Sequence, residues 1–297
     1  MRPLYVAGMH GLGDNLHQRA VMRQLVERRS VWLETPWPCL YEDIHGLNVV
    51  GKGSHLRTQA RNAAREADRY SKEPVPKDAE LLEVRYMPDD VRRLGSVLAA
   101  MCKTCGVDYA KADFRLDVPS AWRKKGDAFL RKLRPQKPLM IFRPLVERAE
   151  WGGNAPRNPD PYAYRDLYLG LRDRYHVLSI ADLEPHAEWM VGERVQADTE
   201  LHRGELDIET LAAVFAQAAL VFTAPGFPVI LSQAVGVPVI VPFGGYENSS
   251  SYSAGARYSP YLGLDVIRPC QCFSHRHDCD KRMDVAAART RIQEFLR

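Results

Sequence analysis

Short apolar runs alternate with amphipathic segments along the first half of the chain. Runs typical of buried strands lie at 4–8, 31–34 and 81–86. Apolar residues with helical spacing predict helices over 15–29, 56–70, 89–102 and 120–133. Because strands that alternate with helices form parallel sheets with right-handed crossovers, this half is expected to contain one such sheet.

A second series of the same kind begins at Pro138. It predicts strands over 138–142, 176–180, 220–223 and 237–242. The matching helices are expected over 162–175, 208–218, 229–235 and 285–296. We therefore expect an α/β protein with two Rossmann-like parallel-sheet domains, 1–135 and 136–297, facing each other across a cleft. The last helix is a candidate to pack back on the first domain.

A glycine-rich turn, Gly11-Leu12-Gly13-Asp14, joins the first expected strand to the first helix. Such a turn lies at the carboxyl edge of a parallel sheet, where open α/β sheets bind their ligands. The two glycines allow a tight turn and place Asp14 beside the helix N-terminus. Asp14 is then either a helix cap or a functional acid at the mouth of the crevice, and His10 and His17 flank it.

Two turns of the second half hold corresponding positions at strand ends. The first opens a helix, whose N-terminal N–H groups favour a phosphate, and the second ends in an acid suited to sugar hydroxyls. Arg143 and Arg157 add candidate bidentate phosphate contacts, and Tyr246 or Phe243 is a candidate to stack on a flat ring. The residues assigned to ligand binding in these turns are Thr223, Ala224, Pro225, Gly226, Phe227, Phe243, Gly244, Gly245 and Glu247.

The composition is that of a globular protein, with 45% hydrophobic and 26% charged residues in a chain of 297. No apolar run is long enough to span a bilayer, and the first strand begins too early for a signal peptide, so we expect a cytoplasmic protein. The net charge of +4 is concentrated in residues 1–135, where Lys and Arg outnumber Asp and Glu. This imbalance favours a polyanionic partner.

Part of this positive charge comes from a regularly spaced row of arginines. Arg57, Arg61, Arg65 and Arg69 recur every four residues, which places them along one face of a helix shortly after Lys52. The row suits a phosphate backbone in DNA, and it equally suits a phosphorylated lipopolysaccharide core. A solvated charged face has the same spacing, so the pattern alone does not choose among these.

Six cysteines raise the question of a metal site. Cys102-x-x-Cys105 and the tail motif with Cys270, Cys272, His275, His277 and Cys279 contain the residue types that bind zinc. In the cytosol they are expected to be thiols or metal ligands rather than disulfides. Because the spacings are irregular, we expect no metal to be required, with zinc at Cys270, Cys272 and Cys279 as the alternative.

Taken together, these motifs resemble the heptosyltransferase-like glycosyltransferases of family nine over nearly the whole chain. Residues 11–16 are similar to that family's first loop, residues 206–221 to its helix and strand before the donor site, and residues 232–240 to the following small-residue helix and Gly-x-Pro strand. The cysteine-containing tail also resembles the family's tails. The resemblance implies the GT-B fold, a nucleotide-sugar donor, and Asp14 as general base. His10 and His17 are candidates to assist because they flank Asp14, and His10 is the one assigned to catalysis.

The donor loop departs from the family pattern. Pro225 and Ile230 stand where the family has Asp and His, and Arg157 and Asn158 stand where a phosphate-binding Lys and a Trp are expected. A donor other than ADP-heptose is therefore expected.

We thus expect an inverting glycosyltransferase that moves a sugar from a nucleotide sugar to a hydroxyl of a polyanionic acceptor, with no cofactor required. The altered donor loop and the arginine row favour hydroxymethylated bases in DNA over the lipopolysaccharide core. The acceptor contacts are assigned to Gly11, Gly13, Lys52, Arg57, Arg61 and Arg65. The alternatives are a heptosyltransferase-like enzyme of the lipopolysaccharide core, a nucleotide-sugar epimerase, and a non-catalytic zinc- or nucleic-acid-binding protein.

Overall fold

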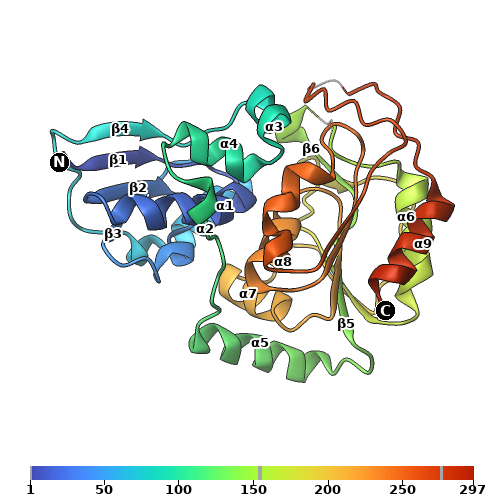
Figure 1. Ribbon diagram of the computed structural model, residues 1–297. Helices are drawn as coiled ribbons and strands as arrows, with labels where there is room; N and C mark the ends of the chain where they lie inside the picture. Colours follow the sequence, from blue (N-terminus) through green and yellow to red (C-terminus); the bar gives the residue numbers. More distant parts are fainter. Residues whose placement is uncertain (1, 153–155, 275–276) are drawn as a thin grey trace. The chain divides into compact units, whose positions relative to one another are not determined.

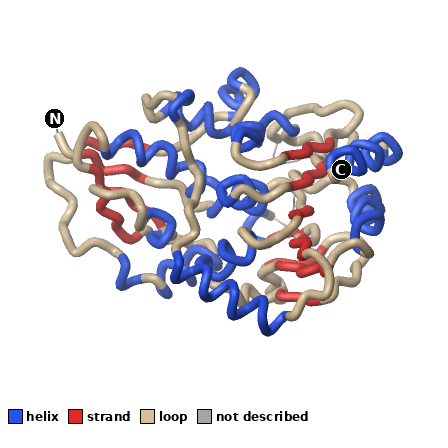
Figure 2. The backbone as a smooth tube through the Cα atoms, turned by 60° about the horizontal axis from the view of Figure 1, so that its bottom comes forward, coloured by secondary structure: helices blue, strands red, loops and turns tan. Residues whose placement is uncertain are grey.

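The computed structural model describes residues 2–152, 156–274 and 277–297. The chain divides into two compact units, Met1–Leu116 and Asp117–Arg297. Each unit is built on a parallel sheet, and Figure 2 shows the strands of each sheet flanked by helices. This confirms the expected α/β class with one parallel sheet in each half of the chain.

The first unit has a four-stranded sheet in the order β3-β2-β1-β4, with β1 in an interior position (Figure 1). All three pairings are parallel. Its strands are β1 (Leu4–Ala7), β2 (Val31–Thr35), β3 (Leu47–Gly51) and β4 (Glu80–Glu83). Its helices are α1 (Leu12–Val26), α2 (Arg57–Arg65), α3 (Pro88–Leu94) and α4 (Val97–Thr104), with 3-10 turns at Pro38–Tyr41, Ala67–Arg69 and Tyr109–Lys111.

Two of the expected helices are interrupted in the structure. The helix expected over 89–102 is divided at Gly95, whose φ of +78° ends α3, and the Ser96 side chain then caps α4 by accepting from the Ala99 N–H at 3.0 Å. The helix expected over 56–70 ends at Arg65 and continues as a 3-10 turn. Strand β3 was not expected from the sequence and extends the sheet beyond β2.

The second unit has a six-stranded parallel sheet in the order β12-β11-β10-β5-β7-β9, with a separate antiparallel pair β6-β8. Its strands are β5 (Leu139–Phe142), β6 (Val146–Arg148), β7 (His176–Ile180), β8 (Glu188–Met190), β9 (Thr199–Leu201), β10 (Leu220–Phe222), β11 (Val239–Pro242) and β12 (Tyr261–Leu264). Its helices are α5 (Ser120–Leu133), α6 (Pro161–Arg172), α7 (Ile208–Phe215), α8 (Phe227–Val235) and α9 (Val285–Phe295), with 3-10 turns at Ala149–Trp151 and Ser249–Arg257.

An aromatic cluster forms part of the core of this unit. The ring centroids of Phe142 and Tyr168 are 4.3 Å apart, and those of Tyr164 and Phe222 are 4.9 Å apart. Because these rings come from β5, β10 and α6, burying them fixes α6 against the centre of the sheet. The carboxyl ends of β5 and β10 are thereby held side by side.

The boundary between the units differs from the expected junction at residues 134–138. Helix α5 packs along α7 and belongs to the second unit, which begins at Asp117. The close packing depends on Gly126, because a Cβ there would lie 2.7 Å from the Ala213 Cβ. Lys125 also pairs with Asp207 at 3.2 Å. A proline-containing connection was thus a poorer guide to the boundary than the apolar face of α5.

The last helix packs within the second unit. Ala288 and Ile292 of α9 are buried in the core cluster, and Arg289 pairs with Asp166 of α6 at 2.5 Å. The apolar face of α9 is thus buried within the second unit, and packing of this helix on the first domain stays a prediction. None of the helices in the described ranges combines the length and apolar character that a membrane span requires.

Candidate active site

The turn between β1 and α1 presents Asp14 at the carboxyl edge of the first sheet. Gly11 is the N-cap residue of α1, so Asp14 lies in the first helical turn and is not the cap. A Cβ on Gly11 would lie 2.5 Å from Asp14 Oδ2, so glycine leaves room for the carboxylate over the start of the helix. The Tyr86 hydroxyl donates to Asp14 Oδ1 at 3.1 Å. The Asn15 amide braces the turn by donating to Gly11 O at 2.8 Å.

The two histidines that flank Asp14 have different environments. His10 is partly exposed, and burial together with the nearby Lys52 and His55 lowers its pKa. Its Nδ1 has no hydrogen-bond partner within the described part of the chain. His17 is fully buried edge-on against Phe114, with a centroid distance of 4.9 Å, and burial lowers its pKa to about 3. His10 is therefore the one of the two that is accessible beside the turn.

The cations assigned to the acceptor are only partly available. Lys52 Nζ pairs with Glu34 at 3.0 Å. Arg57, Arg61 and Arg65 lie on α2, but Arg69 lies beyond the end of the helix and pairs with Glu42. The row on the helix therefore has three members rather than four.

Helix α2 is attached to its unit by polar contacts. The Asn62 amide donates to Pro36 O at 2.8 Å, and Glu66 Oε2 accepts the Cys39 N–H at 3.0 Å. The buried residues of the helix itself are Gln59 and Asn62. Arg65 is exposed, whereas Arg57 and Arg61 are partly buried, so the row is only partly open to solvent.

In the second unit, Arg143 meets the start of α8. Its guanidinium carbon lies 5.0 Å from the centroid of the Phe227 ring, the first residue of α8, and its backbone carbonyl accepts from the Tyr164 hydroxyl at 2.7 Å. Burial lowers the pKa of Arg143 to about 10, so the guanidinium remains charged at neutral pH. Cation and helix N-terminus together favour an anion at this point.

Glu188 links this arginine to a second one that the sequence did not single out. Arg148 Nε lies 2.8 Å from Glu188 Oε2, and Arg143 Nη2 lies 3.5 Å from Glu188 Oε1. The antiparallel pair β6-β8 sets Arg148 directly opposite Glu188. Strands of three residues leave no readable period in the sequence, which is why this pair was missed.

The loop before α8 offers backbone rather than side-chain groups. The Thr223 side chain is fully buried and its hydroxyl donates to Ala224 O at 2.9 Å, so it is not directed at a ligand. Ala224, Pro225 and Gly226 are partly exposed and have no polar side-chain atom. Recognition at this loop therefore depends on its N–H groups and on Arg143.

The turn after β11 is compressed between two other loops. A Cβ on Gly244 would lie 2.3 Å from Asn158 O, and Gly245 has a φ of +89°, so both positions need glycine. Glu247 is 1% exposed, accepts from the Tyr252 hydroxyl at 3.0 Å, and lies 3.3 Å from Arg157 Nε. Glu247 was expected to meet sugar hydroxyls, but its burial makes it a partner of Arg157 instead.

Arg157 also lies over the ring of Tyr246, with 5.9 Å between the guanidinium carbon and the ring centroid. Of the two rings considered for stacking, Tyr246 is half-buried and Phe243 is fully buried. Phe243 packs inward against Tyr252 at 5.8 Å, so the assignment of a stacking role to it was wrong. The ligand-facing candidates of this turn are Arg157 and Tyr246.

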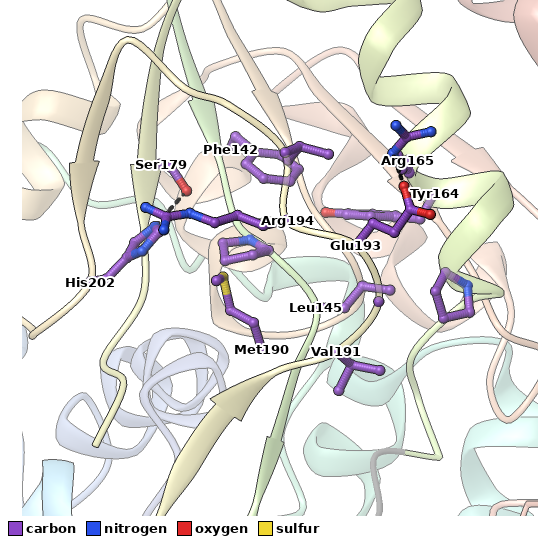
Figure 3. A pocket seen from close by; sticks show the side chains of 14 residues that line it. Phe142, Leu145, Tyr164, Arg165, Ser179, Met190, Val191, Glu193, Arg194 and His202 are labelled. Carbon is purple, nitrogen blue, oxygen red and sulfur yellow. Dashed lines mark hydrogen bonds and ion pairs between the residues drawn. The ribbon is translucent and has the colours of Figure 1, made fainter. Parts of the chain in front are cut away.

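A small cavity lies between the end of β5 and the start of α6, where Phe142, Leu145 and Tyr164 line it (Figure 3). Its volume is about 30 Å³, which is room for roughly two ordered water molecules. The Ser179 hydroxyl and His202 Nε2 face each other across 2.8 Å at one side. The rest of the lining combines apolar groups such as Phe142 with the charged side chains of Arg165, Glu193 and Arg194. The hollow is therefore a polar recess, with the Ser179–His202 pair on one side and the Arg165–Glu193 ion pair on the other.

Five of the six cysteines form two groups, and the sixth, Cys39, is buried in the first unit. Ligand atoms of Cys270, Cys272, His277 and Cys279 lie within 4.8 Å of one another. His275, considered earlier as a further ligand, lies outside the described residues. Cys102 and Cys105 are buried at α4 in the first unit, and burial raises the pKa of Cys105 to about 11, which disfavours its thiolate.

Comparisons with known proteins bear on the fold. No protein-family model matches the chain, and no curated protein matches it in sequence. The ADP-heptose lipopolysaccharide heptosyltransferase II of E. coli superposes with a TM-score of 0.58 and 12% identity, covering 100% of this chain and 98% of that one. A family 9 glycosyl transferase of Veillonella parvula superposes with a TM-score of 0.53 and 17% identity, covering 88% and 85%.

The iron-containing dodecameric glycosyltransferase TibC of enterotoxigenic E. coli superposes with a TM-score of 0.60 and 13% identity, covering 99% of this chain and 76% of that one. Identities this low establish fold rather than activity. The chain therefore has the GT-B fold of the heptosyltransferase-like glycosyltransferases, as its motifs predicted.

Proposed function

We propose that this protein is an inverting glycosyltransferase that uses a nucleotide-sugar donor. The observation that carries the proposal is the anion site of the second unit, where Arg143 lies over the first residue of α8 at the carboxyl edge of the sheet. A leaving nucleoside diphosphate develops negative charge, and a guanidinium beside a helix N-terminus stabilises such charge. Arg157, fixed by Glu247, supplies a second cation.

In the proposed reaction, Asp14 removes the proton from an acceptor hydroxyl as the hydroxyl oxygen attacks the anomeric carbon of the donor. The bond from that carbon to the diphosphate oxygen breaks, and the configuration at the carbon inverts. Tyr86 orients the carboxylate through its 3.1 Å hydrogen bond, and His10 assists from the same turn. The released nucleoside diphosphate carries the negative charge away, so the step needs no cofactor beyond the donor.

The donor loop supports a sugar nucleotide other than ADP-heptose. Ala224 and Pro225 provide no side-chain donor or acceptor, and Ile230, at the position of the family's histidine, is 5% exposed within α8. A loop without polar side chains distinguishes sugars by backbone contacts and shape rather than by side-chain hydrogen bonds to particular hydroxyls.

For the acceptor, we propose a phosphorylated glycan of the lipopolysaccharide-core type. The arginines of α2 fit separated phosphate groups, and the E. coli heptosyltransferase II of the same fold is described as a lipopolysaccharide enzyme. Hydroxymethylated DNA, favoured from the sequence, remains a prediction. Lys52 pairs with Glu34 and Arg69 pairs with Glu42, so the row of cations is shorter than expected for either acceptor.

The test is incubation of the protein with a panel of nucleotide sugars and two acceptors, followed by mass spectrometry. The acceptors are core oligosaccharide and duplex DNA with hydroxymethylated bases. We expect one sugar to be added to the oligosaccharide. Addition to DNA instead would restore the nucleic-acid proposal. An isomerised donor with no transfer would identify an epimerase, and intact donor with every acceptor would contradict an enzymatic role.

A further inference from the structure

Four side chains with metal-binding atoms come together in the tail of the second unit. They belong to Cys270, Cys272, His277 and Cys279, and their ligand atoms all lie within 4.8 Å of one another. In a tetrahedral zinc site with Zn–S bonds of about 2.3 Å, neighbouring ligand atoms are about 3.8 Å apart. The cluster is therefore within about 1 Å of the size that a single ion requires. Three sulfurs and one ring nitrogen are a common donor set of structural zinc.

The backbone of this segment is wound tightly around the sulfur atoms. Gln271 and Phe273 have φ angles of +46° and +51°, and these are two of the four non-glycine residues with positive φ among the residues described. L-residues adopt such angles only where the surroundings impose them. The Ser274 N–H points at Cys272 Sγ at 3.4 Å, a contact that a negatively charged sulfur accepts better than a thiol.

The same segment is bonded to the glycine turn of the candidate active site. The Gln271 N–H donates to Gly245 O at 2.9 Å, and the Phe273 N–H donates to Tyr246 O at 3.4 Å. The ring of Tyr246 lies 5.3 Å from that of Phe273, and edge-on to His277 at 6.1 Å. Tyr246 is also the ring under Arg157. Tyr246 thus contacts both the cysteine segment and Arg157, the candidate phosphate-binding residue.

We propose that Cys270, Cys272, His277 and Cys279 bind one zinc ion, and that this ion clamps the turn from Gly244 to Glu247. Three thiols lose their protons to become ligands, so binding one Zn²⁺ releases three protons to solvent. One of these is the proton by which Cys270 Sγ contacts Gly245 O at 3.1 Å. The proposal does not depend on glycosyl transfer, since a metal clamp would hold the turn whatever ligand it meets.

The metal is tested on the full-length protein, purified without a metal-affinity tag and analysed for metals by mass spectrometry. We expect about one zinc per chain, lost in Cys272→Ser and in Cys279→Ser. Cys105→Ala is the matched control, because Cys105 is a buried thiol at α4, and it should keep the zinc. Replacement of zinc by Co²⁺ should give the intense visible bands of a tetrahedral thiolate site.

The clamp is tested by hydrogen exchange of the wild-type protein before and after chelation, which avoids reliance on variants that fail to fold. Removing zinc should speed exchange in peptides covering 243–248 and 268–274 by about tenfold or more. Peptides covering β1 and the turn after it, residues 4–14, serve as the internal control and should be unchanged.

Several results would overturn the proposal. Protein without zinc that also fails to bind added zinc would reject the site, as would zinc retained in both cysteine variants. A chain two hydrogens lighter than its sequence would indicate a disulfide among these cysteines. Stoichiometric iron would reject the assignment of zinc. Zinc loss without faster exchange at 243–248 would reject the clamp. Because none of these measurements involves a sugar, they leave the proposed transferase activity to its own test.

Discussion

The glycine turns that follow β1 and β11 hold corresponding positions in two parallel sheets, yet the acids at these turns differ in exposure to solvent. Asp14 is partly exposed and receives a hydrogen bond from Tyr86. Glu247 is 1% exposed and faces Arg157 and Tyr252. An acid that exchanges a proton with a substrate must reach it, so Asp14 suits catalysis and Glu247 suits the positioning of a cation. Glycines followed by an acid do not separate these roles, whereas burial does.

The strongest test of this contrast is Asp14→Asn. Asparagine keeps the shape and the first-turn position but cannot accept the proton, so turnover should fall by roughly two orders of magnitude or more. Thermal unfolding and donor affinity should match the wild type. Asp89→Asn, at an acid whose side chain is 89% exposed on α3, is the control and should retain full turnover. A folded Asp14→Asn variant with normal turnover would exclude Asp14 as the base.

The second test concerns Arg143 and Arg157, the two cations assigned to the donor diphosphate. Arg143→Ala should raise the donor Kd by roughly 10- to 150-fold, because a charge-assisted contact contributes about 1.5–3 kcal/mol. Arg157→Ala should act in the same direction. Glu247→Gln should raise Kd less, by about fivefold, because it frees Arg157 without removing it. Calorimetry measures all three.

Arg172→Ala, at a partly exposed position in the last turn of α6, is the control for lost charge and should leave the donor Kd unchanged. If both Arg143→Ala and Arg157→Ala bind the donor as the wild type does, the diphosphate is held elsewhere.

The sequence was sufficient for the order of the elements but not for the orientation of side chains. Apolar runs such as 139–142 and 220–222 are buried on both faces of a parallel sheet, and that pattern is unambiguous. The central strands and the turns after them were therefore predictable. Edge strand β3 was missed because its residues are only partly buried, which leaves a weak apolar signal.

The candidate site was predicted unevenly for a related reason. Arg143 could be placed because it directly follows a buried strand, so its position is fixed by the sheet. Phe243 was misassigned because a residue at a strand end points either to the ligand or to the core, and the choice depends on the packing of Tyr252, nine positions further on. The clustering of the tail cysteines with His277 depends on the left-handed backbone of Gln271 and Phe273, which no sequence pattern predicts.

The third test concerns the two histidines near Asp14. His10 is partly exposed like Asp14, whereas His17 is buried like Glu247. The folded-state pKa of His17, about 3, lies below its unfolded value of about 6.5. Its neutral form therefore contributes stability above pH 6.5 that is lost as pH falls toward 3. At pH 5 the loss is about 2 kcal/mol in the free energy of unfolding. His17→Phe removes this loss, so urea unfolding at pH 7 and pH 5 should show a smaller decrease than in the wild type.

The control for that series is His45→Gln, at an exposed position, whose unfolding should retain the wild-type sensitivity to pH. An unchanged decrease in His17→Phe would mean that another group is responsible for the acid sensitivity.

The smallest expected effect concerns the arginines of α2. If Arg61 and Arg65 each neutralise one phosphate of a polyanion, their joint replacement by alanine should flatten the plot of log affinity against log salt. On duplex DNA the change is about 1.8, since each phosphate contact contributes about 0.9 to the slope. Donor affinity should not change, because the donor contacts are assigned to Arg143 and Arg157.

The paired substitution Arg172→Ala with Arg289→Ala is the control. It removes the same charge from α6 and α9 and should leave the slope intact. Equal slopes in the Arg61/Arg65 variant and the wild type would mean that these arginines form a solvated face and contact no phosphate. A slope that flattens with phosphorylated core oligosaccharide but not with DNA would show that the spacing of α2, and not its charge alone, selects the acceptor.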